Sequence, residues 1–226
     1  MLINADLAQR AVVETANLPW IEPPMPGVAR KLLERDGAEV ARATSLVRYA
    51  AGSRFERHEH GGGEEILVLD GILSDEQGDY PSGTYIRNPP GSSHAPFSRL
   101  GCTLFVKLRQ FVSSDRKRVV IDTNAGAWQP GRTDAYGEML LHQHDGERTY
   151  LINWHAGKSF PLHYHRGGEE IFILSGVYAD EHGTYRQGTW VRAPVGSSHA
   201  PRPTEGALLY AKLGHLPAAE TTPPRL

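Results

Sequence analysis

Residues 52–71, GSRFERHEHGGGEEILVLDG, recur in the chain as residues 157–176, GKSFPLHYHRGGEEIFILSG. The two copies belong to a longer match between residues 52–96 and 157–201, which aligns at a constant offset of 105 positions, has no gap and contains 25 identities in 45 positions. Such a match indicates an internal duplication, so the chain of 226 residues consists of two similar halves. We place the domains at residues 1–113 and 114–226, with the boundary at the start of a polar stretch, and each half is large enough for a hydrophobic core.

Each half carries three histidines and one glutamate in the same spacing. They are His58, His60, Glu64 and His94 in the first half and His163, His165, Glu169 and His199 in the second. Residues i and i+2 of a strand point to the same face, so the two histidines of each His-x-His pair can bind one cation, whereas in a helix they would diverge. Because the whole set recurs in register, we predict a divalent transition metal in each half, two per chain. Zinc, iron, manganese, nickel and cobalt all suit imidazole and carboxylate ligands.

The carboxylate ligand stays open between two neighbours in each half. Glu64 is followed by Glu65, and Glu169 by Glu170. Neighbouring side chains of a strand face opposite ways, so only one member of each pair can face the metal. The six-residue spacing to the glycine that follows favours Glu64 and Glu169, and the other two glutamates are the alternative ligands.

Strand signals dominate the rest of the chain. Residues 40–49 and 149–154 alternate apolar and polar side chains with many β-branched and aromatic residues, and the 24 Gly and 16 Pro predict many turns. One short helix is expected around residues 5–14. The pattern predicts an all-β fold and leaves a sandwich and a barrel equally open.

The motifs Gly52-x5-His58-x-His60-x3-Glu64-x6-Gly71 and Gly83-x5-Pro89-x-Gly91-x2-His94 resemble the two sequence motifs of the cupin superfamily, and the second half repeats them. More narrowly, the Gly-Gly-Glu-Glu run and residues 87–94 are similar to the cupin domain of the anti-sigma factor ChrR. The resemblance covers nearly the whole chain. It implies two tandem cupin barrels, also described as double-stranded β-helices or jelly rolls, with a metal at the mouth of each, and it favours zinc.

Two kinds of function follow from this resemblance. The first is a sensor or regulatory module that binds a small molecule and transmits a response to oxidants through a protein partner, although the helical anti-sigma domain of ChrR has no counterpart in this sequence. The second is an iron-dependent dioxygenase that acts on small diketones or hydroxyketones, because three imidazoles and one carboxylate leave coordination positions open on an octahedral ion. Isomerase, decarboxylase or hydrolase chemistry ranks below both.

Four cationic side chains are candidates for anchoring a ligand in the pocket. Arg87 and Arg192 occupy equivalent positions before the third histidine, and Lys107 and Lys212 lie on the last strand of each half. The alternative role for these residues is a structural salt bridge.

Composition restricts the partners. The formal net charge of −2, with no basic run longer than residues 116–118, argues against direct nucleic-acid binding. Cys102 is the only cysteine, so an intrachain disulfide is excluded. No apolar stretch approaches the length of a membrane span and no signal pattern begins the sequence, so we expect a cytoplasmic protein without membrane contact. A small-molecule ligand and a protein are the expected partners, and a homo-oligomer is compatible with the sequence.

Overall fold

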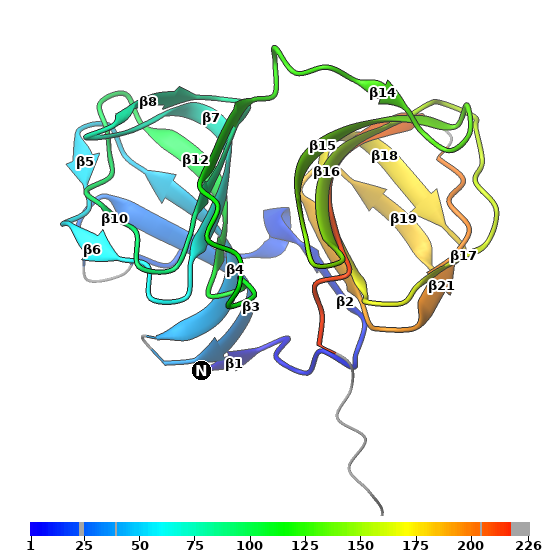
Figure 1. The fold of residues 1–226 in the computed structure, drawn as a ribbon, viewed down its shortest axis with the longest axis horizontal. Helices are drawn as coiled ribbons and strands as arrows, with labels where there is room; N and C mark the ends of the chain where they lie inside the picture. The colour runs from blue at the N-terminus through cyan, green and yellow to red at the C-terminus, as the bar shows by residue number, and fades with distance from the viewer. Residues whose placement is uncertain (23–24, 39, 204, 218–226) are drawn as a thin grey trace, which may run out of the picture. The chain divides into compact units, whose positions relative to one another are not determined.

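The computed structural model describes residues 1–22, 25–38, 40–203 and 205–217, and these residues form β-strands joined by turns (Figure 1). Their only helix is a 3-10 turn, η1 (Thr15–Asn17), and within them no helix is long and apolar enough to span a membrane. The predicted all-β fold is confirmed. The chain divides into two compact units: unit 1 comprises Met1–Ala5 and Thr15–Ala127, and unit 2 comprises Asp6–Glu14 and the chain from Trp128 onward.

Unit 1 is built on one large antiparallel sheet. Its main strand order is β1 (Leu2–Ile3), β3 (Val28–Gly37), β4 (Ala41–Tyr49), β12 (Cys102–Leu108), β7 (Glu64–Asp75), β11 (Phe97–Ser98) and β5 (Ser53–Arg54). The long strand β7 also pairs with β8 (Gly78–Pro81) and β9 (Thr84–Asn88), and β9 pairs with β13 (Val119–Asp122). A separate two-stranded sheet joins β6 (His58–Glu59) to β10 (Ser93–His94).

Unit 2 repeats this plan. Its main strand order is β14 (Gln129–Pro130), β15 (Tyr136–His144), β16 (Glu147–Trp154), β22 (Gly206–Leu213), β18 (Glu169–Asp180), β20 (Thr189–Ala193) and β2 (Ala11–Glu14). Strand β19 (Gly183–Arg186) pairs with β18, and β17 (His163–His165) pairs with β21 (Ser197–His199).

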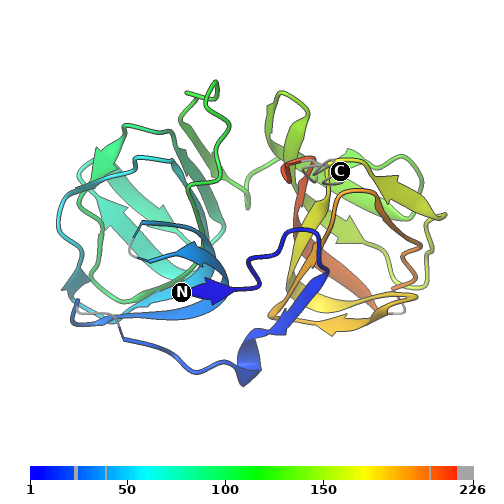
Figure 2. The ribbon, with the colours of Figure 1, turned by 90° about the horizontal axis from the view of Figure 1, so that it is seen from below.

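One edge strand of each unit comes from an unexpected part of the sequence. Unit 2 takes it from the segment before the first repeat, and unit 1 takes it from the segment before the second repeat. Strand β2 precedes the first repeat but pairs with β20 of unit 2, with Ala11 opposite Arg192 (Figure 2). Strand β13 precedes the second repeat but pairs with β9 of unit 1, with Val119 opposite Arg87. The helix expected around residues 5–14 is therefore wrong, because pairing with β20 outweighs the weak local preference. The units also differ from the predicted division at residue 113 by these two segments.

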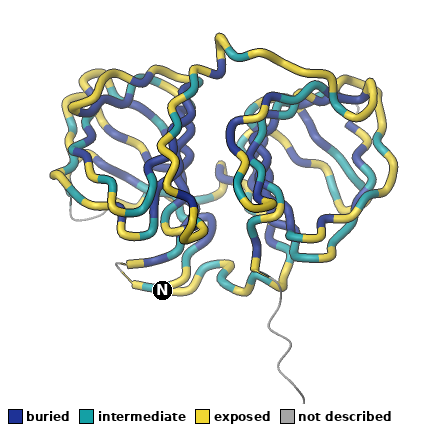
Figure 3. Tube along the Cα trace, viewed as in Figure 1, coloured by how far each residue is buried: buried dark blue, intermediate teal, exposed yellow. Residues whose placement is uncertain are grey.

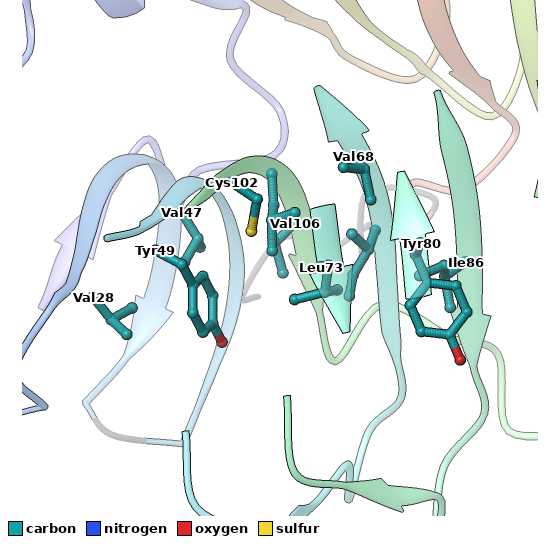
Figure 4. Close-up of a cluster of buried hydrophobic side chains, with 11 residues drawn as sticks. Val28, Val47, Tyr49, Val68, Leu73, Tyr80, Ile86, Cys102 and Val106 are labelled. Carbon is teal, nitrogen blue, oxygen red and sulfur yellow. The ribbon is translucent and has the colours of Figure 1, made fainter. Parts of the chain in front are cut away.

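The cores of the two units differ in character. Buried positions run along the strands of both units, and exposed positions gather in the turns (Figure 3). Aliphatic side chains such as Val47, Val68 and Leu73 dominate the core of unit 1, which also contains Cys102 (Figure 4). The core of unit 2 is richer in aromatic rings, namely Tyr136, Trp154, Tyr178 and Tyr185.

Candidate metal centres

In unit 1, the predicted histidines and glutamate converge on one point. Strands β6 and β10 pair so that His58 lies opposite His94, and His60 follows directly after β6. The ring centroids of the three imidazoles lie 4.8 to 5.1 Å apart. Glu64, the first residue of β7, places its Oε2 atom 3.5 Å from the Nε2 atoms of His60 and His94. One ligand atom from each of the four residues lies within 4.8 Å of all the others.

In unit 2, the three histidines form the same cluster. His163 lies opposite His199 in the pairing of β17 and β21, and the three ring centroids lie 4.6 to 4.8 Å apart. Glu169 Oε2 lies 3.5 Å from His165 Nε2 and 3.4 Å from His199 Nε2. The group in which every ligand atom lies within 4.8 Å of the others contains the three histidines without Glu169. Since this carboxylate is close to His165 and His199, its greater distance is to His163.

The imidazole nitrogens fit a metal in both units. The Nε2 atoms of His60, His94, His165 and His199 are buried without a hydrogen-bond partner. On four of the six rings a protein oxygen lies beside Nδ1: Glu56 O at 2.9 Å from His58, Asp75 Oδ2 at 3.2 Å from His94, Pro161 O at 3.1 Å from His163, and Asp180 Oδ2 at 3.0 Å from His199. A ring that donates from Nδ1 keeps the Nε2 lone pair for a cation. Each buried polar atom without a partner costs about 1–3 kcal/mol, which coordination would offset.

Glycines shape the turn that brings each glutamate to its histidines. Gly63 precedes Glu64 at a φ of +78°, a conformation that side chains other than glycine rarely adopt, and a Cβ there would lie 2.4 Å from the ring of Phe111. Gly168 precedes Glu169 at a φ of +73°, where a Cβ would lie 2.5 Å from Leu216. The glycine-rich turns are therefore required by the backbone and by close packing.

Burial controls the charge of the clusters in the absence of metal. Desolvation lowers the pKa of His60 despite the nearby Glu64 carboxylate, and it lowers the pKa of His165 to about 3, with His199 and His163 adding to the effect. Burial also lowers the pKa of His199, but the hydrogen bond to Asp180 and the charge of Glu169 outweigh it, so the net shift is upward. Neutral imidazoles such as His60 and His165 present lone pairs for metal binding at neutral pH.

Asp75 and Asp180 are functional candidates that the sequence interpretation missed. Besides its contact with His94, Asp75 accepts a hydrogen bond from the Tyr80 hydroxyl at 3.0 Å. Asp180 accepts one from the Tyr185 hydroxyl at 3.2 Å and lies 3.6 Å from the guanidinium of Arg10, which precedes β2. Both aspartates align at the offset of 105 positions, so the repeat itself held the signal that could have found them.

The second glutamate of each pair points away from its cluster. Glu65 accepts hydrogen bonds from Arg87 at 2.9 Å and from the Tyr85 hydroxyl at 3.0 Å. Glu170 accepts one from the indole of Trp190 at 2.8 Å and lies 3.3 Å from His215 Nε2. The structure therefore brings Glu64 and Glu169, rather than their neighbours, to the histidines.

The four candidate pocket cations lie elsewhere. Arg87, Arg192, Lys107 and Lys212 are fully buried, and none lines the cavity of its unit. Arg87 also donates to Asp115 at 2.6 Å, and Arg192 donates to the Asp6 carbonyl at 2.8 Å. Lys107 donates to Thr44 at 3.0 Å, and Lys212 pairs with Glu147 at 2.8 Å. Their contacts correspond to the structural alternative.

Each histidine cluster borders a cavity of about 270 Å³ inside its own unit. Both cavities reach the metal-ligand candidates, including His58 in unit 1 and His163 in unit 2. A cavity of this size next to the cluster provides space for a small molecule beside a bound metal.

The family called the ChrR cupin-like domain matches this sequence twice, over residues 8–112 and 116–217. The chain belongs to the ChrR cupin-like domain family. No curated protein sequence matches the chain. The two matched regions begin next to β2 and β13, so each family domain includes the strand that completes the other unit.

Solved structures show the same fold. A candidate dioxygenase from Nostoc punctiforme is 14% identical with a TM-score of 0.77, over 95% of this chain and 86% of its own. Protein Ylba from E. coli is 16% identical with a TM-score of 0.72, over 96% of this chain and 95% of its own. A deletion mutant of Bacillus subtilis oxalate decarboxylase is 12% identical with a TM-score of 0.62, over 92% and 78%. With the family match, these similarities confirm the prediction of two cupin units.

Proposed function

We propose that the chain is a bicupin that binds one divalent transition metal in each unit and a small molecule beside it, and that it serves as a sensor or regulatory module with a protein partner. The observation that carries this proposal is the set of buried Nε2 atoms without a partner, gathered around a carboxylate in each unit. Zinc is the favoured ion, because three imidazoles with one carboxylate form an ordinary zinc ligand set. The family match supports the regulatory role.

The residues of the chain have separable roles in this proposal. The three histidines and the glutamate of each unit hold the ion, and the ion supplies Lewis acidity together with coordination positions for a ligand. Asp75 and Asp180 hold one imidazole of each cluster in place through Nδ1. The cavity next to each cluster admits the ligand and shields it from bulk solvent.

Metal content tests the proposal directly. We would measure it by elemental mass spectrometry on protein that is purified without a histidine tag. The expected result is two metal ions per chain, and His58→Ala and His163→Ala should each remove one ion. A content near zero in folded wild-type protein, or a content that neither substitution changes, would overturn the proposal.

An iron-dependent dioxygenase is the second candidate function. The cavities favour it, since a chelating substrate needs space next to the metal, and the fold similarity to a candidate dioxygenase supports it. The Mn(II) centres of the oxalate decarboxylase with the same fold support manganese, which is already among the candidate ions. Oxygen consumption by the iron-loaded protein on addition of small diketones or hydroxyketones would favour the enzyme. If the purified protein contains zinc, and the iron-loaded protein consumes no oxygen with these substrates, the dioxygenase is excluded.

A further inference from the structure

The two cavities share their metal-ligand pattern but differ in their walls. The walls can be compared position by position, because Tyr49 pairs with Cys102 in unit 1 as Trp154 pairs with Ala207 in unit 2, which keeps the offset of 105 positions along these strands. Where the first cavity has Ala43, Ser45, Tyr49 and Leu73, the second has Arg148, Tyr150, Trp154 and Tyr178. An alanine is thus replaced by a cation, a serine and a leucine by tyrosines, and a tyrosine by the larger indole of tryptophan.

Among the residues that the structure describes, none forms an ion pair with Arg148. It is half-buried on β16 and lines the second cavity, and its Nε atom is buried without a hydrogen-bond partner. Arg132 and Glu138 line the same cavity, but no ion pair within the described chain joins Glu138 to either arginine. A guanidinium that is partly removed from water without an anion loses hydration that nothing replaces. An anionic ligand in the cavity would give the guanidinium a counter-ion, and a carboxylate matches the planar fork of its donors.

Flat aromatic surfaces cover the adjoining part of the wall. The ring of Tyr136 lies 4.8 Å from that of Trp154 and 5.7 Å from that of Phe160, measured between centroids. The indole Nε1–H of Trp154 is buried without an acceptor. Aromatic walls of this kind bind planar, apolar bodies well.

We propose that the second cavity binds a small organic carboxylate with a planar body, whose carboxylate pairs with Arg148 and whose body packs on the aromatic wall beside the metal cluster. The inference rests on the proposed function in that the ligand lies next to a bound metal. The first cavity has Ala43 in place of Arg148 and does not offer this contact. Three other arginines line the first cavity, namely Arg30, Arg35 and Arg109. The guanidinium of Arg30 lies 6.0 Å from the ring centroid of Phe55, and Arg35 donates to the Ala38 carbonyl.

Calorimetric titration of the metal-loaded full chain tests the proposal. The probes are benzoate and phenylacetate, with benzamide as a neutral molecule of the same shape as benzoate. One carboxylate per chain should bind, and benzamide should not. Arg148→Met should weaken benzoate binding about 10- to 150-fold, since it removes a charge-assisted pair, while Arg148→Lys should retain part of the affinity. Arg30→Met, the matched change in the first cavity, should leave the affinity unchanged.

The outcomes separate this inference from the proposed function. Metal content is measured for every variant first, and circular dichroism verifies the fold. If two metals are bound and neither carboxylate binds, or if binding does not depend on Arg148, this inference is overturned and the metal-binding proposal stands. Equal binding of benzamide, or a loss caused by Arg30→Met, would also overturn the inference. If the folded chain binds no metal, the proposed function is overturned. In that case the anion site is judged by benzoate binding alone: binding that depends on Arg148 supports the site, and binding that does not depend on Arg148 overturns it.

Discussion

The contact between Asp180 and His199 makes a measurable prediction about metal affinity. Asp180 Oδ2 lies 3.0 Å from His199 Nδ1, and the aspartate side chain is 1% exposed. Asp180→Ala removes the acceptor that orients this imidazole toward the cluster. Loss of such a partner typically weakens metal binding 10- to 100-fold, which corresponds to about 1.4–2.7 kcal/mol of binding free energy.

The assay must report on one site at a time. In a His58→Ala background only the cluster of unit 2 retains its full ligand set, so a chromophoric chelator that competes for zinc measures the affinity of that cluster. At about pH 8 protons compete little with the metal for an imidazole of ordinary pKa. Asp70→Ala, at an exposed position of unit 1, is the matched control and should leave the affinity unchanged.

Two results would refute the reasoning. An unchanged affinity in Asp180→Ala would show that packing alone positions His199. An equal loss in Asp70→Ala would show that the effect follows from total charge rather than from the hydrogen bond. Asp180→Asn provides a graded comparison, because the amide oxygen can still accept from Nδ1–H although the negative charge is gone.

Three further predictions concern the stability of the chain and the metal occupancy of its two units. The lowered pKa of His165 keeps its imidazole neutral in the folded, metal-free protein, whereas the same side chain in the unfolded chain takes up a proton near pH 6.5. The melting temperature of the metal-free protein should therefore fall as pH drops from about 6.5 toward 3. His165→Gln should flatten this decline, and an equally steep decline in the variant would contradict the assignment. Gly168→Ala should lower the free energy of unfolding by about 1–2 kcal/mol from the positive φ alone and by more from the contact with Leu216. Gly196→Ala, at a φ of +78° with no atom within 4 Å of the added Cβ, measures the cost of the positive φ alone in chemical denaturation. If both variants lose the same free energy of unfolding, the contact with Leu216 makes no contribution. Deletion of residues 6–14 removes β2 and Arg10 and leaves β1 of unit 1 in the chain. It should lower metal occupancy in unit 2 more than in unit 1, and a uniform loss would argue against a local role.

Most residues of the candidate site could be predicted from the repeat, because the ligands are set by spacings of a few residues along the sequence. His58 and His60 stand two positions apart on an extended segment, so strand geometry alone predicts that they converge. Alternation requires that only one of Glu64 and Glu65 face the metal, the spacing to the next glycine favours Glu64, and the structure brings Glu64 to the histidines. The sequence makes Arg87 a pocket candidate because of its position on the strand before the third histidine, with a salt bridge as the alternative role. Its side chain instead reaches Glu65 and Asp115, and the latter lies in a segment whose place no local pattern indicates.

Arg148 shows a different limit of the repeat argument. A comparison of the halves directs attention to positions that match, and Arg148 has alanine as its counterpart, so the duplication gives it no weight. Only the folded sheet, in which Arg148 on β16 and the histidine cluster line one cavity, reveals this position. Positions where the halves differ are therefore the place to look for differences between the ligands of the two units.

The exchange of β2 and β13 explains why sequence repeats and structural units do not coincide. A short edge strand alternates its side chains with the same period whichever partner it has, so neither strand indicates in sequence which sheet it completes. Val12, opposite Val191, would suit the equivalent edge of either unit. Nevertheless, the exchange has a consequence for the candidate sites, because Arg10 reaches Asp180 at 3.6 Å and Arg118 donates to Tyr80 at 3.1 Å, next to Asp75. Each candidate metal centre thus has, close to the aspartate beside its third histidine, an arginine from the segment that precedes the other repeat.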